Sequence, residues 1–243
     1  MEARAEHQKT KLFKSLYAFA TSMGLGTLTL ILFWILHYRN GFAWQSDPNT
    51  QFNWHPFLMA LGMFFLYSQS ILSYRTFRYV AKRRLKLLHA GIHLFAFVFS
   101  VIGLKAAFDS HNLKNPPVPN LYTMHSWIGL ATVIIFSAQY VYGFVSFLYP
   151  GLSQSYRRMF MPAHVAVGTG GFVMATISVL TGLTEKTVWT VKDYSDYSSE
   201  GLMCNFIAIF AVFYALIVLY MVNDDDYKRT PLPEDEMVLS TTN

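Results

Sequence analysis

Hydrophobic residues along the chain gather in six long stretches that are separated by short polar segments. Each stretch is close to the roughly 20 apolar residues that an α-helix needs to cross a hydrocarbon core. The stretches cover residues 16–37, 55–74, 87–108, 123–149, 163–183 and 202–222. The pattern predicts an all-α integral membrane protein, a bundle of six transmembrane helices that forms one domain over residues 1–222.

Short polar connections join the stretches, each of roughly 12 to 18 residues, so successive helices are expected to be antiparallel neighbours. Turn-forming residues mark these connections, as in Asp47-Pro48-Asn49. The last segment, residues 223–243, is rich in acidic residues and contains prolines. It predicts a solvated, disordered cytosolic tail.

Composition and charge agree with a membrane location. The chain is 53% hydrophobic and only 14% charged, and its formal net charge is +5. A basic excess can indicate nucleic-acid binding, but most of the 19 Lys and Arg residues fall in the N-terminal segment, the connections after the second and fourth stretches, and the tail. The positive-inside rule then places these segments and both termini in the cytosol. The basic excess is therefore a topology signal, and no nucleic-acid partner is expected.

Few residue types remain that could carry chemistry inside the membrane. The single cysteine, Cys204, excludes an internal disulfide and a thiolate metal cluster, and the chain has no CxxCH motif for covalent haem attachment. Redox chemistry would therefore need a non-covalent cofactor. The six stretches contain no Asp, Glu or Arg, and Lys105 lies near a helix end, which leaves histidine as the ionisable residue at depth.

Four histidines lie at alternating ends of the four central stretches. His55 and His125 open the second and fourth stretches from the outer side, whereas His89 and His164 open the third and fifth from the cytosolic side. Two pairs result, one near each membrane face. Two neutral imidazoles can occupy both axial positions of a haem iron, so the pattern fits two bis-histidine b-type haems held by the central four helices. Such iron can only pass electrons.

Small residues next to these histidines favour the same interpretation. Gly129 and Gly168 follow the histidines of the fourth and fifth stretches by four residues, on the same helix face, where a flat macrocycle needs missing side chains. His93 of the third stretch has no partner and is not assigned as a ligand. His37 has no assigned role.

The residues by themselves leave other interpretations open. The histidines could form a proton relay in a cofactor-free membrane transporter, or they could make structural hydrogen bonds between helices. A quinol-linked dihaem cytochrome subunit is a further alternative. Such a subunit usually takes two ligands from one helix, whereas here four helices each supply one.

Several motifs resemble those of one known family. Residues 121–129, LYTMHSWIG, closely resemble the (N)LYSLHSWxG signature of the cytochrome b561 family. Residues 52–56 (FNWHP), 87–90 (LLHA) and 161–164 (MPAH) fall where that family has its other histidine ligands. The resemblance covers nearly the whole chain. It departs where TM replaces the common SL of the signature, and no histidine is affected.

The resemblance implies an activity that spacing does not supply. Members of the family are ascorbate-dependent transmembrane electron carriers, so it implies an oxidoreductase with two non-covalent haem b groups. Cytosolic ascorbate would be the donor, and monodehydroascorbate or a ferric chelate would be the acceptor on the other face. The resemblance also implies a multi-pass protein of a secretory vesicle, endolysosomal or plasma membrane, and it suggests a homodimer.

The resemblance further assigns roles to residues near each face, where cations suit the negative charge of ascorbate and of haem propionates. It implies a cytosolic ascorbate site of Lys82, Lys86, Arg157 and Tyr149. It implies an outer acceptor site of Phe108, His111 and Asn112. The residues that it places at the haem rims or propionates are Arg75, Lys82, Asn120, Tyr122 and Glu185.

Overall fold

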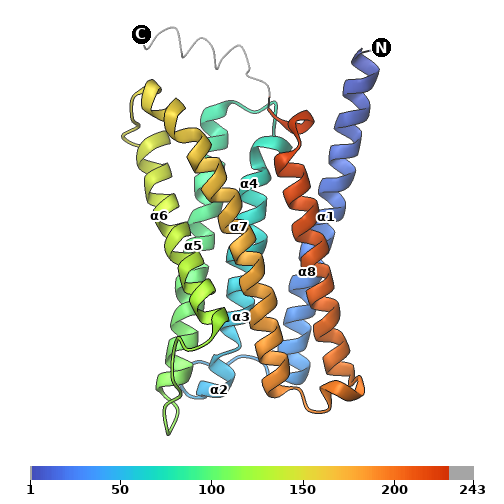
Figure 1. Ribbon diagram of the computed structural model, residues 1–243, viewed down its shortest axis with the longest axis vertical. Coiled ribbons are helices and arrows are strands. Elements are labelled where there is room, and N and C mark those ends of the chain that lie inside the picture. The colour runs from blue at the N-terminus through green and yellow to red at the C-terminus, as the bar shows by residue number, and fades with distance from the viewer. Residues whose placement is uncertain (1, 230–243) are drawn as a thin grey trace.

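The computed structural model describes residues 2–229, which form helices and, within that range, no β-strand (Figure 1). The elements are α1 (Glu2–Tyr38), α2 (Pro48–Gln51), α3 (Trp54–Met59), the π-helical segment η1 (Ala60–Leu66), α4 (Tyr67–Thr76), α5 (Lys82–Asn112), α6 (Met124–Phe147), α7 (Gln154–Thr190), the 3₁₀ turn η2 (Tyr194–Asp196), α8 (Ser199–Asn223) and the 3₁₀ turn η3 (Asp225–Tyr227). The second predicted stretch is thus built from α3, η1 and α4 in succession.

Six helical spans in the described part of the chain are long and apolar enough to cross a membrane, which confirms the predicted all-α, six-span architecture. The helices extend past the predicted stretches. The clearest case is α7, which begins at Gln154 instead of residue 163 and ends at Thr190 instead of residue 183. Hydropathy marks only the part of a helix that lies in hydrocarbon, because its ends carry side chains suited to water.

Both ends of the described chain lie at one end of the bundle (Figure 1). Lys9 near the start of α1 forms an ion pair of 2.7 Å with Asp226 in η3. Tyr227 is buried, and its ring centroid lies 5.1 Å from that of Phe13 on α1. We call this end the terminal face and the other end the opposite face. Residues 225–227 of the predicted tail are therefore packed against the bundle, and residues 230–243 lie outside the described residues.

The helices pack around a core that joins both halves of the chain. Figure 1 shows α1 beside α8 and α6 beside α7, with α3 and α4 between these pairs. Phe64, Phe172 and Tyr214 form the centre of the core, and the first two rings stack with centroids 6.0 Å apart. The Tyr67 hydroxyl donates a hydrogen bond of 2.9 Å to the carbonyl of Gly168. These contacts fix α4 and η1 against α7 and α8.

The π-helical segment η1 changes the helical register between α3 and α4. A π-helix closes i→i+5 hydrogen bonds, so the residues after it are rotated relative to an uninterrupted α-helix. A Cβ atom at Gly62 would lie 2.9 Å from the carbonyl oxygen of Ala96. Glycine therefore permits the close contact of η1 with α5. Hydropathy does not predict this segment.

The short helix α2 lies in a connection that the sequence predicts only as a turn. Asp47 is its N-cap, because its carboxylate accepts a hydrogen bond of 3.0 Å from the Asn49 amide and another from the Thr50 hydroxyl. The hydrogen bond from Thr50 lowers the pKa of Asp47, which keeps the cap ionised. Pro48 at the first helical position is favourable, since its missing N–H would have no helical partner.

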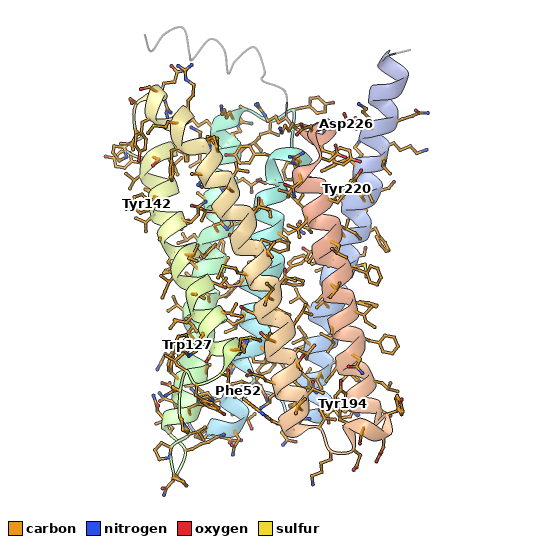
Figure 2. The ribbon with its side chains drawn as sticks, viewed as in Figure 1. Phe52, Trp127, Tyr142, Tyr194, Tyr220 and Asp226 are labelled. Carbon is orange, nitrogen blue, oxygen red and sulfur yellow. The ribbon has the colours of Figure 1, made fainter. Side chains whose placement is uncertain are left out.

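Exposed aromatic side chains lie toward both ends of the spans, as Figure 2 shows. Tyr142 and Tyr220 lie in the half near the terminal face, whereas Trp127 and Tyr194 lie in the half near the opposite face. Aromatic residues with a polar group are enriched where membrane meets water. Their distribution agrees with a bundle that spans a bilayer.

Candidate functional site

The opposite-face pair consists of His55 at the start of α3 and His125 at the start of α6. Their ring centroids lie 6.1 Å apart at an interplanar angle of 80°. The Nδ1 of His55 lies 3.2 Å from the carbonyl oxygen of Gly103, and the Nδ1 of His125 lies 2.9 Å from that of Ser178. A carbonyl can only accept, so each Nδ1 donates, and in a neutral ring Nε2 is then the free lone pair.

The terminal-face pair consists of His89 on α5 and His164 on α7. Their ring centroids lie 6.3 Å apart at 62°. The Nδ1 of His89 donates to the carbonyl of Ser70 at 3.0 Å, and the Ser70 hydroxyl donates to the carbonyl of His89 at 2.9 Å. The buried Nδ1 of His164 has no hydrogen-bond partner in the described part of the chain. The two members of this pair are thus held differently.

Both pairs fit a metal centre between two imidazoles. An imidazole nitrogen binds a transition metal at about 2 Å, and about 1 Å more separates that nitrogen from the ring centroid, so two rings on one ion have centroids about 6 Å apart. The measured separations match this value. Among residues 2–229 no three His, Cys, Asp or Glu side chains gather as a metal site. A haem would bring its own macrocycle to such a pair, so it would need no third ligand from the protein.

At the two glycines predicted to make room for a macrocycle, an added Cβ atom would make only ordinary van der Waals contacts with the protein. A Cβ atom at Gly129 would meet its nearest neighbour, the Ser178 hydroxyl, at 3.9 Å. A Cβ atom at Gly168 would meet the Gln139 side chain at 3.5 Å. The packing of the protein itself therefore does not require glycine at either position, and the prediction that these glycines leave room for a flat group stays a prediction.

A cavity of about 590 Å³ adjoins the opposite-face pair, within the usual size range of cofactor pockets. It lies among α1, α3, α5, α6 and α7, and both histidines of the pair line it. The predicted rim and acceptor residues that also line it are Phe108, His111, Asn120, Tyr122 and Glu185. The structure therefore brings most of the predicted outer site to one place.

Hydrogen bonds through Asn120 connect two of the predicted acceptor residues, His111 and Asn112. The Nδ1 of His111 lies 3.0 Å from the Asn120 side-chain oxygen, and the Asn120 amide donates to the Asn112 side-chain oxygen at 2.8 Å. The Tyr122 ring stacks on Trp189 with centroids 6.3 Å apart. The end of α5 and the connection that leads to α6 thereby form one polar surface beside the cavity.

The predicted ascorbate residues gather where α5 and α7 begin. Lys86 interacts electrostatically with Lys82 and Arg157, and its ammonium donates a hydrogen bond of 2.9 Å to the carbonyl of Phe147 at the end of α6. Tyr149 is 73% exposed and follows α6 directly. Lys86 therefore lies near the other two predicted cations, and its hydrogen bond reaches the end of α6, two residues before Tyr149.

Arg75 has partners other than those that the resemblance implies. Its guanidinium donates hydrogen bonds to the carbonyls of Val222 and Asp224. These carbonyls lie at the end of α8, where helix geometry leaves them without backbone partners. In this structure Arg75 caps α8.

The two histidines without an assigned role differ from each other. His93 is buried, its ring centroid lies 4.5 Å from that of His89, and its Nδ1 lacks a partner in the described part of the chain. It packs against Phe136. His37 is exposed and stacks on Phe33. Only His93 belongs to the surroundings of a histidine pair.

Several residues at the sites are not predicted from the sequence. Ser70 holds His89, and Gly182 contacts His125 so closely that a Cβ atom there would lie 2.5 Å from the Cε1 of that ring. Lys186 lines the opposite-face cavity and lies over the ring of Phe52. Of these residues only Lys186 has a feature in the sequence that could have indicated a role: it directly follows Glu185, a predicted haem-rim residue, at the end of an apolar stretch.

The comparisons with known proteins bear on this arrangement. Residues 54–190 match the family described as eukaryotic cytochrome b561. The chain belongs to this family. The match extends from the first residue of α3 to the last of α7, which are the helices that carry the four histidines. Cytochromes b561 are membrane oxidoreductases that carry haem b, and this chain is an integral, multi-pass member.

Curated relatives are similar over most of the chain. The transmembrane ascorbate-dependent reductase CYB561 of Ovis aries is 38% identical, over 92% of this chain and 87% of the relative. The CYB561 homologue of Caenorhabditis elegans is 37% identical, over 95% of this chain and 90% of the relative. The lysosomal membrane ascorbate-dependent ferrireductase CYB561A3 of Danio rerio is 36% identical, over 91% of this chain and 92% of the relative.

Proposed function

We propose that this cytochrome b561 transfers electrons across a membrane, from ascorbate at the terminal face to an acceptor at the opposite face. The terminal face would be cytosolic, in agreement with the positive-inside rule. The acceptor would be monodehydroascorbate or a ferric chelate. The observation that carries the proposal is the pairing of four histidines at two opposite ends of the same four helices. The relatives support ascorbate as the donor, because they are described as ascorbate-dependent reductases, and one of them is described as a ferrireductase.

One haem b would bind at each pair, between His55 and His125 and between His89 and His164. Each haem supplies a centre that gains and loses one electron. With the two histidines of a pair holding the haem iron, the group would exchange electrons and would not bind oxygen or substrate. The carbonyls of Gly103, Ser178 and Ser70 orient three of the four rings, as expected for residues that support metal ligands.

At the terminal face, the charge of the site suits ascorbate. Ascorbate is a monoanion at neutral pH, and Lys82, Lys86 and Arg157 would bind its enolate oxygens. Loss of one electron from the monoanion also releases one proton, and the exposed position of this site lets that proton pass to water. The product is the monodehydroascorbate radical, so two successive donations consume two ascorbate molecules.

At the opposite face, the polar surface beside the cavity would hold the acceptor. The acceptor gains one electron, which converts a ferric chelate to its ferrous form or, with one proton, monodehydroascorbate to ascorbate. The imidazole of His111 can contact either acceptor, and Asn120 orients it. Phe108 lines the adjoining cavity. Asn112 completes the hydrogen-bonded set.

Liposomes that contain the purified protein test this proposal. Ascorbate is enclosed inside, ferric citrate and a ferrous-iron indicator are added outside, and the haem absorption bands are recorded together with indicator colour. We expect reduced haem and steady external iron reduction with wild type and with His37→Ala, and much slower iron reduction with His125→Ala or His164→Ala. Haem that is reduced only by a quinol would instead favour a quinol-linked cytochrome. Absence of a haem Soret band would favour a cofactor-free transporter.

A further inference from the structure

Lys186 has an unusual position in the opposite-face cavity. It lies in the last turns of α7, lines the cavity, and is partly buried. Its ammonium lies 4.3 Å from the ring centroid of Phe52. The Phe52 ring in turn stacks on His111 with centroids 6.2 Å apart, and its centroid lies 5.6 Å from that of His55. A positive charge is thus held beside both the acceptor residues and a predicted haem ligand.

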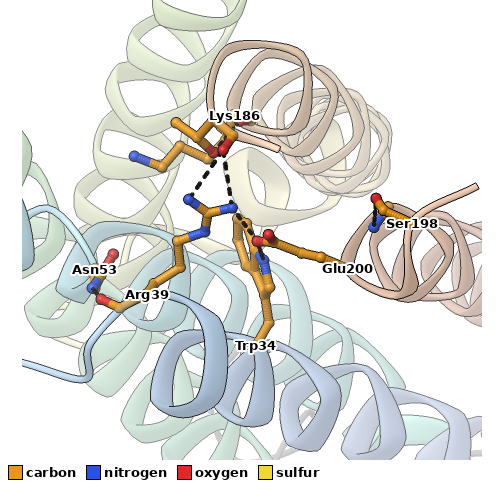
Figure 3. Close-up of polar contacts among 8 residues, drawn as sticks. Trp34, Arg39, Asn53, Lys186, Ser198 and Glu200 are labelled. Carbon is orange, nitrogen blue, oxygen red and sulfur yellow. Dashed lines mark hydrogen bonds and ion pairs between the residues drawn. The ribbon is translucent and has the colours of Figure 1, made fainter. Parts of the chain in front are cut away.

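The carboxylate on the neighbouring helix is occupied by other groups. Glu200 at the start of α8 forms an ion pair with Arg39 and accepts a hydrogen bond of 2.7 Å from the Trp34 indole. Arg39 also donates to the carbonyl of Thr190 at 3.4 Å. Figure 3 shows the Lys186 side chain extending away from this network. Glu200 therefore balances Arg39 and not Lys186.

Among residues 8–229, no residue forms a hydrogen bond or an ion pair with the Lys186 ammonium. Glu185 is adjacent in sequence, but successive helical residues point about 100° apart, and Glu185 interacts electrostatically with His125. The other charged side chains that interact with Lys186 are Arg39 and Lys114, which are both cations. The charges around the cavity therefore include an unbalanced ammonium.

A partly buried ammonium among like charges is unfavourable unless an anion accompanies it. We propose that Lys186 is an anion-binding residue of the opposite-face cavity, held in place by Phe52 to receive a carboxylate or enolate oxygen. Two molecules could supply that oxygen: the haem bound beside His125, through a propionate, or the anionic electron acceptor. This inference rests on the proposed function, because both anions come from it.

The two sources give different results when the charge of Lys186 is removed. We compare Lys186→Gln with wild type, with Lys186→Arg, and with Lys192→Gln, which removes the same charge from an exposed position outside the cavity. The first readout is the rate at which haem leaves the opposite-face site for an excess of a haem-scavenging apoprotein. The second is the KM for anionic ferric citrate divided by the KM for the cationic hexaammineruthenium(III) complex.

A propionate partner predicts that Lys186→Gln releases the opposite-face haem about tenfold faster, with the KM ratio unchanged. An acceptor partner predicts that the KM ratio rises about tenfold, with haem release unchanged. Lys186→Arg should restore most of whichever effect is seen. If Lys186→Gln matches Lys192→Gln in both readouts, the inference is wrong.

A second variant covers the case in which Lys186→Gln fails to fold. Phe52→Leu keeps the charge but removes the ring that positions it, so the same readout should change in the same direction by a smaller factor. An unchanged readout in Phe52→Leu would then overturn the inference. Failure of the proposed function is recognised separately, because wild type itself would lack haem or ascorbate-driven iron reduction.

Discussion

The two histidine pairs share a ligand type and a ring separation but differ in what holds them. At the opposite face, the Nδ1 atoms of His55 and His125 both donate to backbone carbonyls of a neighbouring helix. At the terminal face, only His89 has such a partner, whereas the Nδ1 of His164 has none among the described residues. His164 is positioned instead by ring contacts, with the Phe147 centroid 5.2 Å away.

This difference leads to an expectation for the two proposed haem sites. A hydrogen bond to a carbonyl fixes the ring orientation and increases the basicity of the ligating nitrogen. The opposite-face pair has two such bonds and adjoins a defined cavity, so its geometry is set by the backbone. The terminal-face pair depends on packing at one ligand. We therefore expect changes near His164 to be tolerated better than equally small changes near His125.

The largest effect should come from the histidines themselves. Alanine at any of His55, His125, His89 or His164 removes one axial ligand, so each variant should lose about half of the bound haem. The haem that remains bound should have one absorption spectrum in the His55 and His125 variants and a different spectrum in the His89 and His164 variants. His37→Ala serves as the control and should retain all haem. If His55→Ala and His89→Ala left the same spectrum, the pairing would be wrong.

A glycine next to the opposite-face pair should be nearly as sensitive. Gly182→Val places a branched side chain where even a Cβ atom would lie 2.5 Å from the His125 ring, so most of the opposite-face haem should be lost. Gly170→Ala on the same helix is the control, since no atom lies within 4 Å of a Cβ there. Haem content and the remaining spectrum measure the effect. Retention of both haems in Gly182→Val would contradict a rigid opposite-face pair.

The cations of the terminal face should affect donor binding without affecting the acceptor. Lys86→Gln or Arg157→Gln removes a charged hydrogen-bond donor, so the KM for ascorbate should rise about tenfold. Arg84→Gln changes an exposed cation of the same helix and should have little effect. Steady-state rates at varied ascorbate and at varied ferric citrate separate the two faces. An equal rise in both KM values would argue against separate sites.

The smallest effect is expected at Ser70. In Ser70→Ala the backbone carbonyl still accepts from the His89 Nδ1, whereas the hydroxyl, which donates to the His89 carbonyl and also lies 3.0 Å from the His89 Nδ1, is lost. We expect a change of a few-fold in haem release from the terminal-face site and none at the opposite face. Ser100→Ala is the matched control, because that buried hydroxyl bonds only within its own helix, to the Phe97 carbonyl. A full loss of haem in Ser70→Ala would mean that the terminal-face pair is as rigid as the other.

Hydropathy and residue order predict much of this molecule. The six apolar stretches correspond to six helical spans, and alternation along the chain brings His55 opposite His125 and His89 opposite His164. These features depend on one-dimensional periodicity and on antiparallel connections, both of which a sequence displays.

Other features depend on contacts between distant segments, and periodicity does not display them. The π-helical segment η1 packs closely on α5 at Gly62, where a Cβ atom would lie 2.9 Å from the carbonyl oxygen of Ala96. Arg75 donates hydrogen bonds to two carbonyls at the end of α8, a contact that the resemblance, which places Arg75 at a haem rim or propionate, does not indicate. In the sequence Lys186 is an ordinary cation near the end of a helix. Its contact with the ring of Phe52, which belongs to another helical span, is visible only in the structure.

The measurement that tests the central claim most directly is the number of haems per chain in the purified protein, together with their reduction by ascorbate. Haem is quantified as its pyridine complex, and the chain by amino-acid analysis. Two pairs at two faces predict two haems per chain, both reduced by ascorbate and each lost separately when one pair is broken. A ratio of one haem per chain, with all four histidines needed to hold it, would contradict the account.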